Sequence, residues 1–263
     1  MRKIFVCLLV AGALALTFTA CKKGAGTTLT IGATPVPHAE LLNLVADDLS
    51  AQGITLKVEE FTDYVQPNVA VLAGDLDANF FQHTPYLESN EEWLAGLVPA
   101  FGVHIEPFGL YSAKYTDVNS LPNGASIAIP NDPSNGGRAL LLLQANGLIR
   151  LKDDVGLLAT VHDIVFNPFH YRFRELEAAQ IPRSLQDVDA ATINGNYAIQ
   201  AGFNPLQDSL IIEGAESPYV NIVVVQKGKE NDPNIVALKN ALLSDKVKEY
   251  INSRYEGGVL AVF

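Results

Sequence analysis

The chain has 263 residues, 48% of them hydrophobic, which is enough to form one large domain or two lobes of ordinary size around hydrophobic cores. Its formal net charge of −11 and its pI near 4.8 argue against a protein that binds nucleic acid, because such proteins rely on basic patches. The acidity otherwise indicates only a soluble surface.

The N-terminus has the layout of a signal peptide. Arg2 and Lys3 precede an apolar run, IFVCLLVAGALALTF, which is short for a membrane span. The run ends in TFTAC, which resembles a bacterial lipobox with Cys21 as the acylated first residue of the mature chain, although Phe18 stands where an aliphatic residue is usual. We predict a lipoprotein signal peptide over residues 1–20 and a lipid-anchored tether over 21–27. A plain secretion signal and an uncleaved anchor are the alternatives.

Cleavage before Cys21 changes the chemistry of the mature chain. Its formal charge falls from −11 to −13 because Arg2 and Lys3 leave, and Cys7 leaves with them. Once Cys21 carries lipid, the mature body has no thiol for a disulfide or for a thiolate metal site.

After the tether, short apolar runs alternate with helix-length segments, which predicts α/β architecture. Strands are expected at 28–33 and in the segments ITLKVEEF and LDANFF. Between them, PHAELLNLVADDLSAQG has a helical apolar face and a stop at Gly53, and QPNVAVLAGD predicts a short helix that tolerates Pro67 in its first turn.

The same layout returns later in the chain. Residues 125–130 predict a strand, which a Pro/Gly-rich turn joins to the helix RALLLLQANG. LQDVDAATING then repeats the order of AGDLDANFFQ, in which a turn and Asp-x-Asp-Ala precede an apolar strand and a polar loop. We interpret this as a weak repeat of architecture that predicts two α/β lobes, with chance similarity as the alternative.

Two extended segments are expected to join the lobes. They are GVHIEPFGLYSAKYTDVNSLPNG and the apolar strand at 219–228, which amphipathic helical residues 233–254 follow. The predicted lobe 1 is 28–110 plus 227–263, and the predicted lobe 2 is 111–226 with the crossover strands. Two lobes joined by two strands form a hinge over a cleft that can close on a ligand.

The loop NDPSNGGR in the second lobe has the chemistry of an anion site. Its polar side chains can cap the following helix, whose N-terminus favours an anion, and Arg138 in the first turn can bind a carboxylate with two hydrogen bonds. An ordinary cap with a surface arginine is the alternative. The rival anion ligands are Arg172, Arg174 and Arg183. Uncharged donors and acceptors come from loops that ordinary turn chemistry also explains: Asn194, Asn196, Tyr197 and Asn221.

The stretch DANFFQHTPYL gathers aromatic residues at the end of a predicted strand. Because side chains alternate along a strand, Phe80 and Phe81 cannot both face the core, so one of them should face the cleft. His83 and Tyr86 lie just past the strand end, and Tyr64 can join them. Such a group suits an apolar ligand side chain, and aromatic faces pair well with a thioether.

Nothing in the sequence indicates catalysis or a metal. The chain lacks G-x-S-x-G and H-E-x-x-H, the mature chain lacks a cysteine nucleophile, and the 5 histidines are scattered without metal-ligand spacing. We predict neither an enzyme nor a metal site.

Five segments of the chain resemble one known family. They run over nearly the whole mature chain: TIGATPVPHAELL, DYVQPNVAVLAGDLDANFFQHTPYL, IAIPNDPSNGGRALLLLQANGLI, DAATINGNYAIQAG and ESPYVNIVVV. They are similar to the NlpA-type methionine-binding lipoproteins, the MetQ-like solute receptors of methionine ABC importers. The resemblance implies an α/β, two-lobed periplasmic-binding-protein (type II) fold with two crossover strands and a ligand cleft between the lobes.

The resemblance also implies which residues bind the ligand. Arg138 would hold the ligand carboxylate, and the rest of the amino-acid head group would meet the asparagines Asn135, Asn194, Asn196 and Asn221. The thioether side chain would be enclosed by Tyr64, Phe81, His83 and Tyr86. The choices between Phe80 and Phe81 and between Asn194 and Asn196 stay open.

As for function, the resemblance implies a lipid-anchored extracytoplasmic receptor that captures L-methionine and delivers it to the permease and ATPase subunits of an ABC importer. It implies a monomer without a cofactor, anchored in the bacterial cell envelope through Cys21, with its body in the periplasm or on the outer face. The alternatives are a receptor for a methionine-containing dipeptide or another amino acid, and an adhesion or scaffold lipoprotein that has lost transport.

Overall fold

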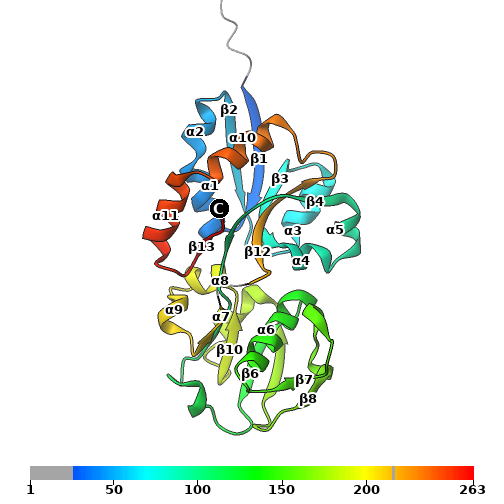
Figure 1. Ribbon diagram of the computed structural model, residues 1–263, viewed down its shortest axis with the longest axis vertical. Helices are drawn as coiled ribbons and strands as arrows, with labels where there is room; N and C mark the ends of the chain where they lie inside the picture. The colour runs from blue at the N-terminus through cyan, green and yellow to red at the C-terminus, as the bar shows by residue number, and fades with distance from the viewer. Residues whose placement is uncertain (1–25, 215–216) are drawn as a thin grey trace, which may run out of the picture.

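The computed structural model describes residues 26–214 and 217–263 and contains two large sheets, one above the other in Figure 1. The six-stranded sheet has the order β13 (Leu260–Ala261), β4 (Leu97–Ile105), β12 (Val220–Gln226), β3 (Ala78–His83), β1 (Thr27–Ala33) and β2 (Ile54–Glu60). Strands β1, β2 and β3 are parallel, whereas β12 is antiparallel to both β3 and β4.

Short helices surround this first sheet. They are the π-helical turn η1 (Pro35–Ala39), α1 (Glu40–Leu44), α2 (Ala46–Ser50), α3 (Gln66–Ala73), α4 (Thr84–Glu88), α5 (Glu91–Gly96), α10 (Pro233–Leu242) and α11 (Asp245–Tyr255). The helix predicted over PHAELLNLVADDLSAQG is therefore divided, and it departs from helical geometry at Val45 (φ −100, ψ 3). Val45 is β-branched and fully buried. Because a β-branched residue has only a weak preference for helix, the packing of its side chain decides its backbone conformation.

The five-stranded sheet has the order β11 (Ile211–Ile212), β5 (Gly109–Tyr111), β10 (Ala190–Ile193), β6 (Ser126–Pro130) and β9 (Arg172–Leu176). Its helices are α6 (Pro133–Ala145), α7 (Ile181–Ser184), α8 (Gly195–Gln200) and α9 (Pro205–Asp208). The remaining elements are the hairpin β7 (Arg150–Leu151) and β8 (Ile164–Phe166) and the 3₁₀ turns η2 (Val118–Ser120), η3 (Gly156–Leu158), η4 (Val161–Asp163) and η5 (Ala178–Gln180).

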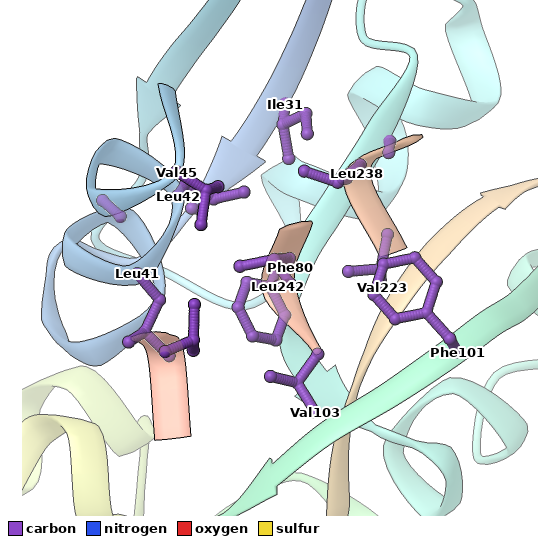
Figure 2. Packing of buried hydrophobic residues seen from close by; sticks show 14 of the residues in the cluster. Ile31, Leu41, Leu42, Val45, Phe80, Phe101, Val103, Val223, Leu238 and Leu242 are labelled. Carbon is purple, nitrogen blue, oxygen red and sulfur yellow. The ribbon is translucent and has the colours of Figure 1, made fainter. Parts of the chain in front are cut away.

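Each sheet has its own hydrophobic core. In the first, Ile31 and Phe80 from the sheet pack against Leu238 and Leu242 of α10, and Figure 2 shows these side chains pointing toward one another. In the second, α6 buries Leu140 and Leu143 in the same cluster as strand residues of β6. Separate cores explain why the two sheets form distinct bodies in Figure 1.

The chain passes between the sheets twice within the described residues. It leaves the six-stranded sheet after Ile105, enters the other at Gly109, and returns between Ile212 and Val220. Strand β12, predicted as a crossover of the second lobe, is hydrogen-bonded between β3 and β4 in the six-stranded sheet. We propose two lobes on this basis, and the boundaries predicted at residues 110 and 226 stay a prediction. Within 26–214 and 217–263, no helix is long and apolar enough to cross a membrane.

The two faces of α10 allow a direct test of the first core. Leu238→Ala should lower the free energy of unfolding by about 2–5 kcal/mol, because Leu238 is fully buried and its removal leaves a cavity. Val236→Ala on the same helix is the control, since Val236 is 40% exposed, and it should change the free energy by no more than about 0.5 kcal/mol. Urea denaturation followed by circular dichroism measures both. Equal losses in the two variants would contradict this description of the core.

Candidate functional site

The carboxyl ends of β1, β3 and β4 lie at one edge of the first sheet, and those of β6 and β10 lie at one edge of the second. Between these edges is a cavity lined by residues from both sheets. Its walls are Tyr64, Phe81, Gln82, His83, Tyr86, Glu106, Asn135, Arg138, Asn194, Gly195, Asn196 and Asn221. The structure therefore brings together all nine residues that the sequence predicted for a ligand site.

Strand alternation separates the two neighbouring phenylalanines. Phe80 is fully buried in the core of the first sheet, where its ring meets His38 edge-on at 4.6 Å. Phe81 points the other way and lines the cavity. The structure thus places Phe81, and not Phe80, at the predicted site.

Aromatic rings form the wall contributed by the first sheet and its loops. Tyr64 lies 5.8 Å from Phe81 and 5.7 Å from Tyr86 between ring centroids. The Tyr86 hydroxyl donates to the carbonyl of Tyr64 at 3.1 Å, and the Tyr64 hydroxyl donates to Asn196 Oδ1 at 2.6 Å. Their hydroxyls are used by protein partners, so the rings offer a ligand mainly apolar faces.

A chain of hydrogen bonds links His83 of the first sheet to α6 of the second. Asp132 caps α6 by accepting from the backbone and side-chain N–H groups of Asn135. Asn135 Oδ1 in turn lies 3.2 Å from His83 Nε2 and 2.8 Å from Asn194 Nδ2. Since the backbone of Tyr86 donates to His83 Nδ1, the proton of the ring is on Nε2 and is donated to Asn135. This chain fixes the orientation of every amide in it.

His83 is consequently a poor catalytic base. Burial, followed by the nearby charge of Arg138, lowers the pKa of His83 from 6.5 to about 3, so the ring is neutral at physiological pH. Both of its ring nitrogens are engaged by protein groups. His83 therefore serves the cavity as part of its lining.

Arg138 is the cation of the cavity and is almost completely buried. Its Nε and Nη2 donate to the two carboxylate oxygens of Glu213, and Nη2 also donates to the carbonyl of Glu106 at 3.0 Å. The rings of Tyr219 and Phe108 lie 4.1 and 5.0 Å from the guanidinium carbon. Among residues 26–214 and 217–263, these bonds use Nε and Nη2, and none of them involves Nη1. The rival cations, which are all exposed and outside the cavity lining, are Arg172, Arg174 and Arg183.

Two asparagine atoms in the cavity wall have no hydrogen-bond partner among the described residues. They are the acceptor Oδ1 of Asn194 and the donor Nδ2 of Asn196. A buried polar atom without a partner costs about 1–3 kcal/mol, which a polar ligand can recover. Both Asn194 and Asn196 thus lie in the cavity wall with one atom available.

Sequence reasoning missed Glu106, Gln82 and Gly195 in the cavity lining. The available signal for Glu106 was a single acidic residue inside the apolar segment VHIEPFGL. Its Oε1 lies 2.8 Å from His104 Nε2 and 3.3 Å from His38 Nε2, and His38 also contacts Asn221. These ligand-type atoms lie within 4.8 Å of one another, and hydrogen bonds join His104 Nε2 to Glu106 and His38 Nε2 to Asn221. The predicted lipid attachment site, Cys21, lies outside the described residues.

Comparison with known proteins finds relatives in sequence and in structure. Residues 29–263 match the NlpA lipoprotein family. The D-methionine-binding lipoprotein MetQ of Escherichia coli K12 is 43% identical over 84% of this chain and 82% of its own length. Among solved structures, a nutrient-binding protein from Burkholderia cenocepacia bound to methionine is 44% identical, with a TM-score of 0.86 over 89% of this chain and all of its own.

A second solved structure addresses the fold. It is an ABC transporter periplasmic substrate-binding protein from Coxiella burnetii, which is 41% identical and has a TM-score of 0.84 over 89% of this chain and all of its own. The predicted periplasmic-binding-protein fold is confirmed by these matches.

The low pKa of His83 predicts a pH dependence of stability. The unfolded chain takes up a proton near pH 6.5, whereas folded His83 does so only near pH 3, so stability should fall as the pH drops below 6.5. His83→Gln removes this contribution. Between about pH 7 and about pH 5, the variant should lose less free energy of unfolding than the wild type, by about 1–2 kcal/mol.

Urea denaturation at the two pH values measures this difference. The control is His162→Gln, which replaces an exposed histidine and should keep the wild-type pH dependence. A wild-type pH dependence in His83→Gln would show that His83 is not the neutral buried group described here.

Proposed function

Because this chain belongs to the NlpA lipoprotein family, we propose that it is an extracytoplasmic solute-binding protein that captures L-methionine and delivers it to an ABC importer. Its relatives bear the names of methionine-binding lipoproteins and of a transporter substrate-binding protein. Such proteins are receptors, not enzymes, and we propose no catalytic role for the residues of the cavity.

The observation that carries this proposal is the division of the cavity into a polar and an apolar half. The polar half has the Nη1 of Arg138 and the unpartnered atoms of Asn194 and Asn196. The apolar half consists of the rings of Tyr64, Phe81 and Tyr86. An amino acid with a thioether side chain matches both halves, because a sulfur atom interacts favourably with aromatic rings.

We assign the ligand contacts accordingly. Arg138 holds the carboxylate through Nη1, because Glu213 already occupies the fork formed by Nε and Nη2. The asparagines Asn135, Asn194, Asn196 and Asn221 form the wall around the head group. His83 closes the wall between the polar half and the rings, since it contacts both Asn135 and Tyr86.

We further propose that the mature protein is a monomer held at the membrane by lipid on Cys21. Two or more acyl chains are needed for stable anchoring. The body of the protein then lies in the periplasm or on the outer face of the cell envelope. There it can contact the permease of the importer, and through the permease it acts with the ATPase subunits. No cofactor or nucleic acid takes part.

Isothermal titration of the soluble body tests the receptor function. The protein is unfolded and refolded before titration, so that ligand bound during expression is removed. We expect L-methionine to bind with a dissociation constant of about 1 μM or lower, which corresponds to a binding free energy of about −8 kcal/mol or more favourable. Absence of L-methionine binding by the refolded wild type would overturn the proposal.

Two variants test the assigned contacts. Arg138→Ala and Asn221→Ala should each weaken methionine binding by at least about tenfold, since each removes a polar group of the buried wall. Arg174→Ala is the matched control, because Arg174 is exposed and lies outside the cavity, and it should bind as the wild type does. Unchanged binding by Arg138→Ala would instead favour a scaffold protein that no longer uses the cavity.

A further inference from the structure

Strand β3 contains an irregular step where it forms the aromatic wall of the cavity. Its pairing with β12 passes from Ile222–Gln82 directly to Val223–Phe80, so Phe81 is an extra residue on β3, as in a β-bulge. A bulge bends its strand and changes the direction of nearby side chains. The extra residue here is the phenylalanine that lines the cavity.

The bulge brings two amide side chains of β3 onto the same face. Residues three positions apart on a regular strand point to opposite faces. Because the extra residue lies between Asn79 and Gln82, these two side chains meet, and Gln82 Nε2 donates to Asn79 Oδ1 at 2.9 Å. Both also bond to Asn68 of α3. Asn79 Nδ2 donates to Asn68 Oδ1 at 2.8 Å, and the side chains of Asn68 and Gln82 donate to each other at 3.0 and 2.6 Å.

This amide cluster of Asn68, Asn79 and Gln82 is buried and fully hydrogen-bonded. The three side chains belong to residues that are 0%, 0% and 2% exposed, and each of their polar side-chain atoms takes part in at least one of the bonds above. Asn79 Nδ2 also donates to the carbonyl of Pro67 at 3.1 Å. A buried polar network whose members are all bonded permits one arrangement, since any other leaves buried groups without partners. The amide cluster therefore fixes the bulge of β3 against the first turn of α3.

Tyr64 is tied to the same turn of α3 through the loop that precedes it. Asp63 Oδ1 accepts from the backbone N–H groups of Val65 and Gln66, at 2.8 Å each, which binds this loop to the start of the helix. Tyr64 lies within the loop, and its ring centroid is 5.8 Å from that of Phe81. The amide cluster consequently sets the spacing of the two rings, because one ring is held by β3 and the other by α3.

We propose that Asn68 is a positioning residue for the apolar half of the cavity, which acts with Asn79 and Gln82 to hold Phe81 and Tyr64 at the spacing that a ligand side chain requires. Asn68 itself lies outside the cavity lining. Hydrogen bonds suit this role because they are directional, whereas apolar packing is not. This proposal rests on the receptor function above and concerns how the cavity discriminates among ligand side chains.

The variant Asn68→Ala tests the positioning role with two ligands. L-Methionine reaches the rings, whereas L-2-aminobutyrate has the same head group and lacks the thioether. We expect the variant to bind methionine at least about tenfold more weakly and aminobutyrate no more than about threefold more weakly, because only methionine depends on the spacing of the rings. Isothermal titration measures the affinity for methionine, and competition with methionine measures the affinity for aminobutyrate.

Val71→Ala is the matched control, since Val71 is fully buried on the next turn of α3 and is not part of the amide cluster. It should lower the thermal stability, as Asn68→Ala does, but it should weaken the binding of both ligands by the same factor. Unchanged methionine affinity in Asn68→Ala, or equal losses for the two ligands, would overturn the proposal. A loss confined to methionine in Val71→Ala would also overturn it, because the packing of α3 would then be the cause.

The wild type provides a measurement that does not depend on the folding of a variant. The side-chain NH₂ protons of Asn79 and Gln82, observed by NMR, should exchange slowly with water both without ligand and with methionine, because the amide cluster is complete within the protein. If the wild type binds methionine but these protons exchange rapidly, only the positioning role is overturned. Absence of methionine binding by the wild type would overturn the receptor function, and this inference with it.

Discussion

The buried guanidinium of Arg138 is the point at which the parts of this molecule meet. Its helix, α6, belongs to the five-stranded sheet, but its partners lie on both segments that connect the two sheets. Glu106 and Phe108 are on the outgoing segment, and Glu213 and Tyr219 are on the returning one. A charge that is nearly excluded from water needs all of these contacts. The position of α6 relative to both connections is therefore constrained by one side chain.

The cavity follows from this constraint together with the direction of the strands. The strands that contribute to each wall end at the same edge of their sheet, so the loops after β3, β4, β6 and β10 converge near Arg138. Neutral groups then complete the wall: the amides bond to one another, and the histidines are kept uncharged by burial. Among the described residues that line the polar half, Arg138 is paired with Glu213 outside the lining, and burial raises the pKa of Glu106.

Much of this could be predicted from the sequence, because the signals were local. Apolar runs and helix stops placed most strands and helices, and the loop residues Asn135, Arg138 and Asn194 follow strands whose ends form the cavity. What could not be predicted depends on contacts between distant segments. The choice of Phe81 over Phe80 needed the actual direction of β3. Glu213 could not be connected with Arg138 because 75 residues separate them. Glu106 is isolated in an apolar segment, and its place in the cavity wall becomes visible only when His38 and His104 are brought beside it.

The hydrogen bonds between the two proposed lobes bear on how such a cavity opens. Tyr64 bonds to Asn196, His83 to Asn135, and Tyr197 to the carbonyl of Thr62, and each bond joins the first sheet or its loops to the second. A hydrogen bond of this kind contributes about 0.5–1.5 kcal/mol, so together they favour the observed arrangement of the two sheets only modestly. Opposing them is the cost of burying the carboxyl group of Glu106, whose pKa burial raises, and the atoms of Asn194 and Asn196 that have no partner among the described residues. A ligand that pairs with these groups stabilises the arrangement seen here by its differential affinity for it.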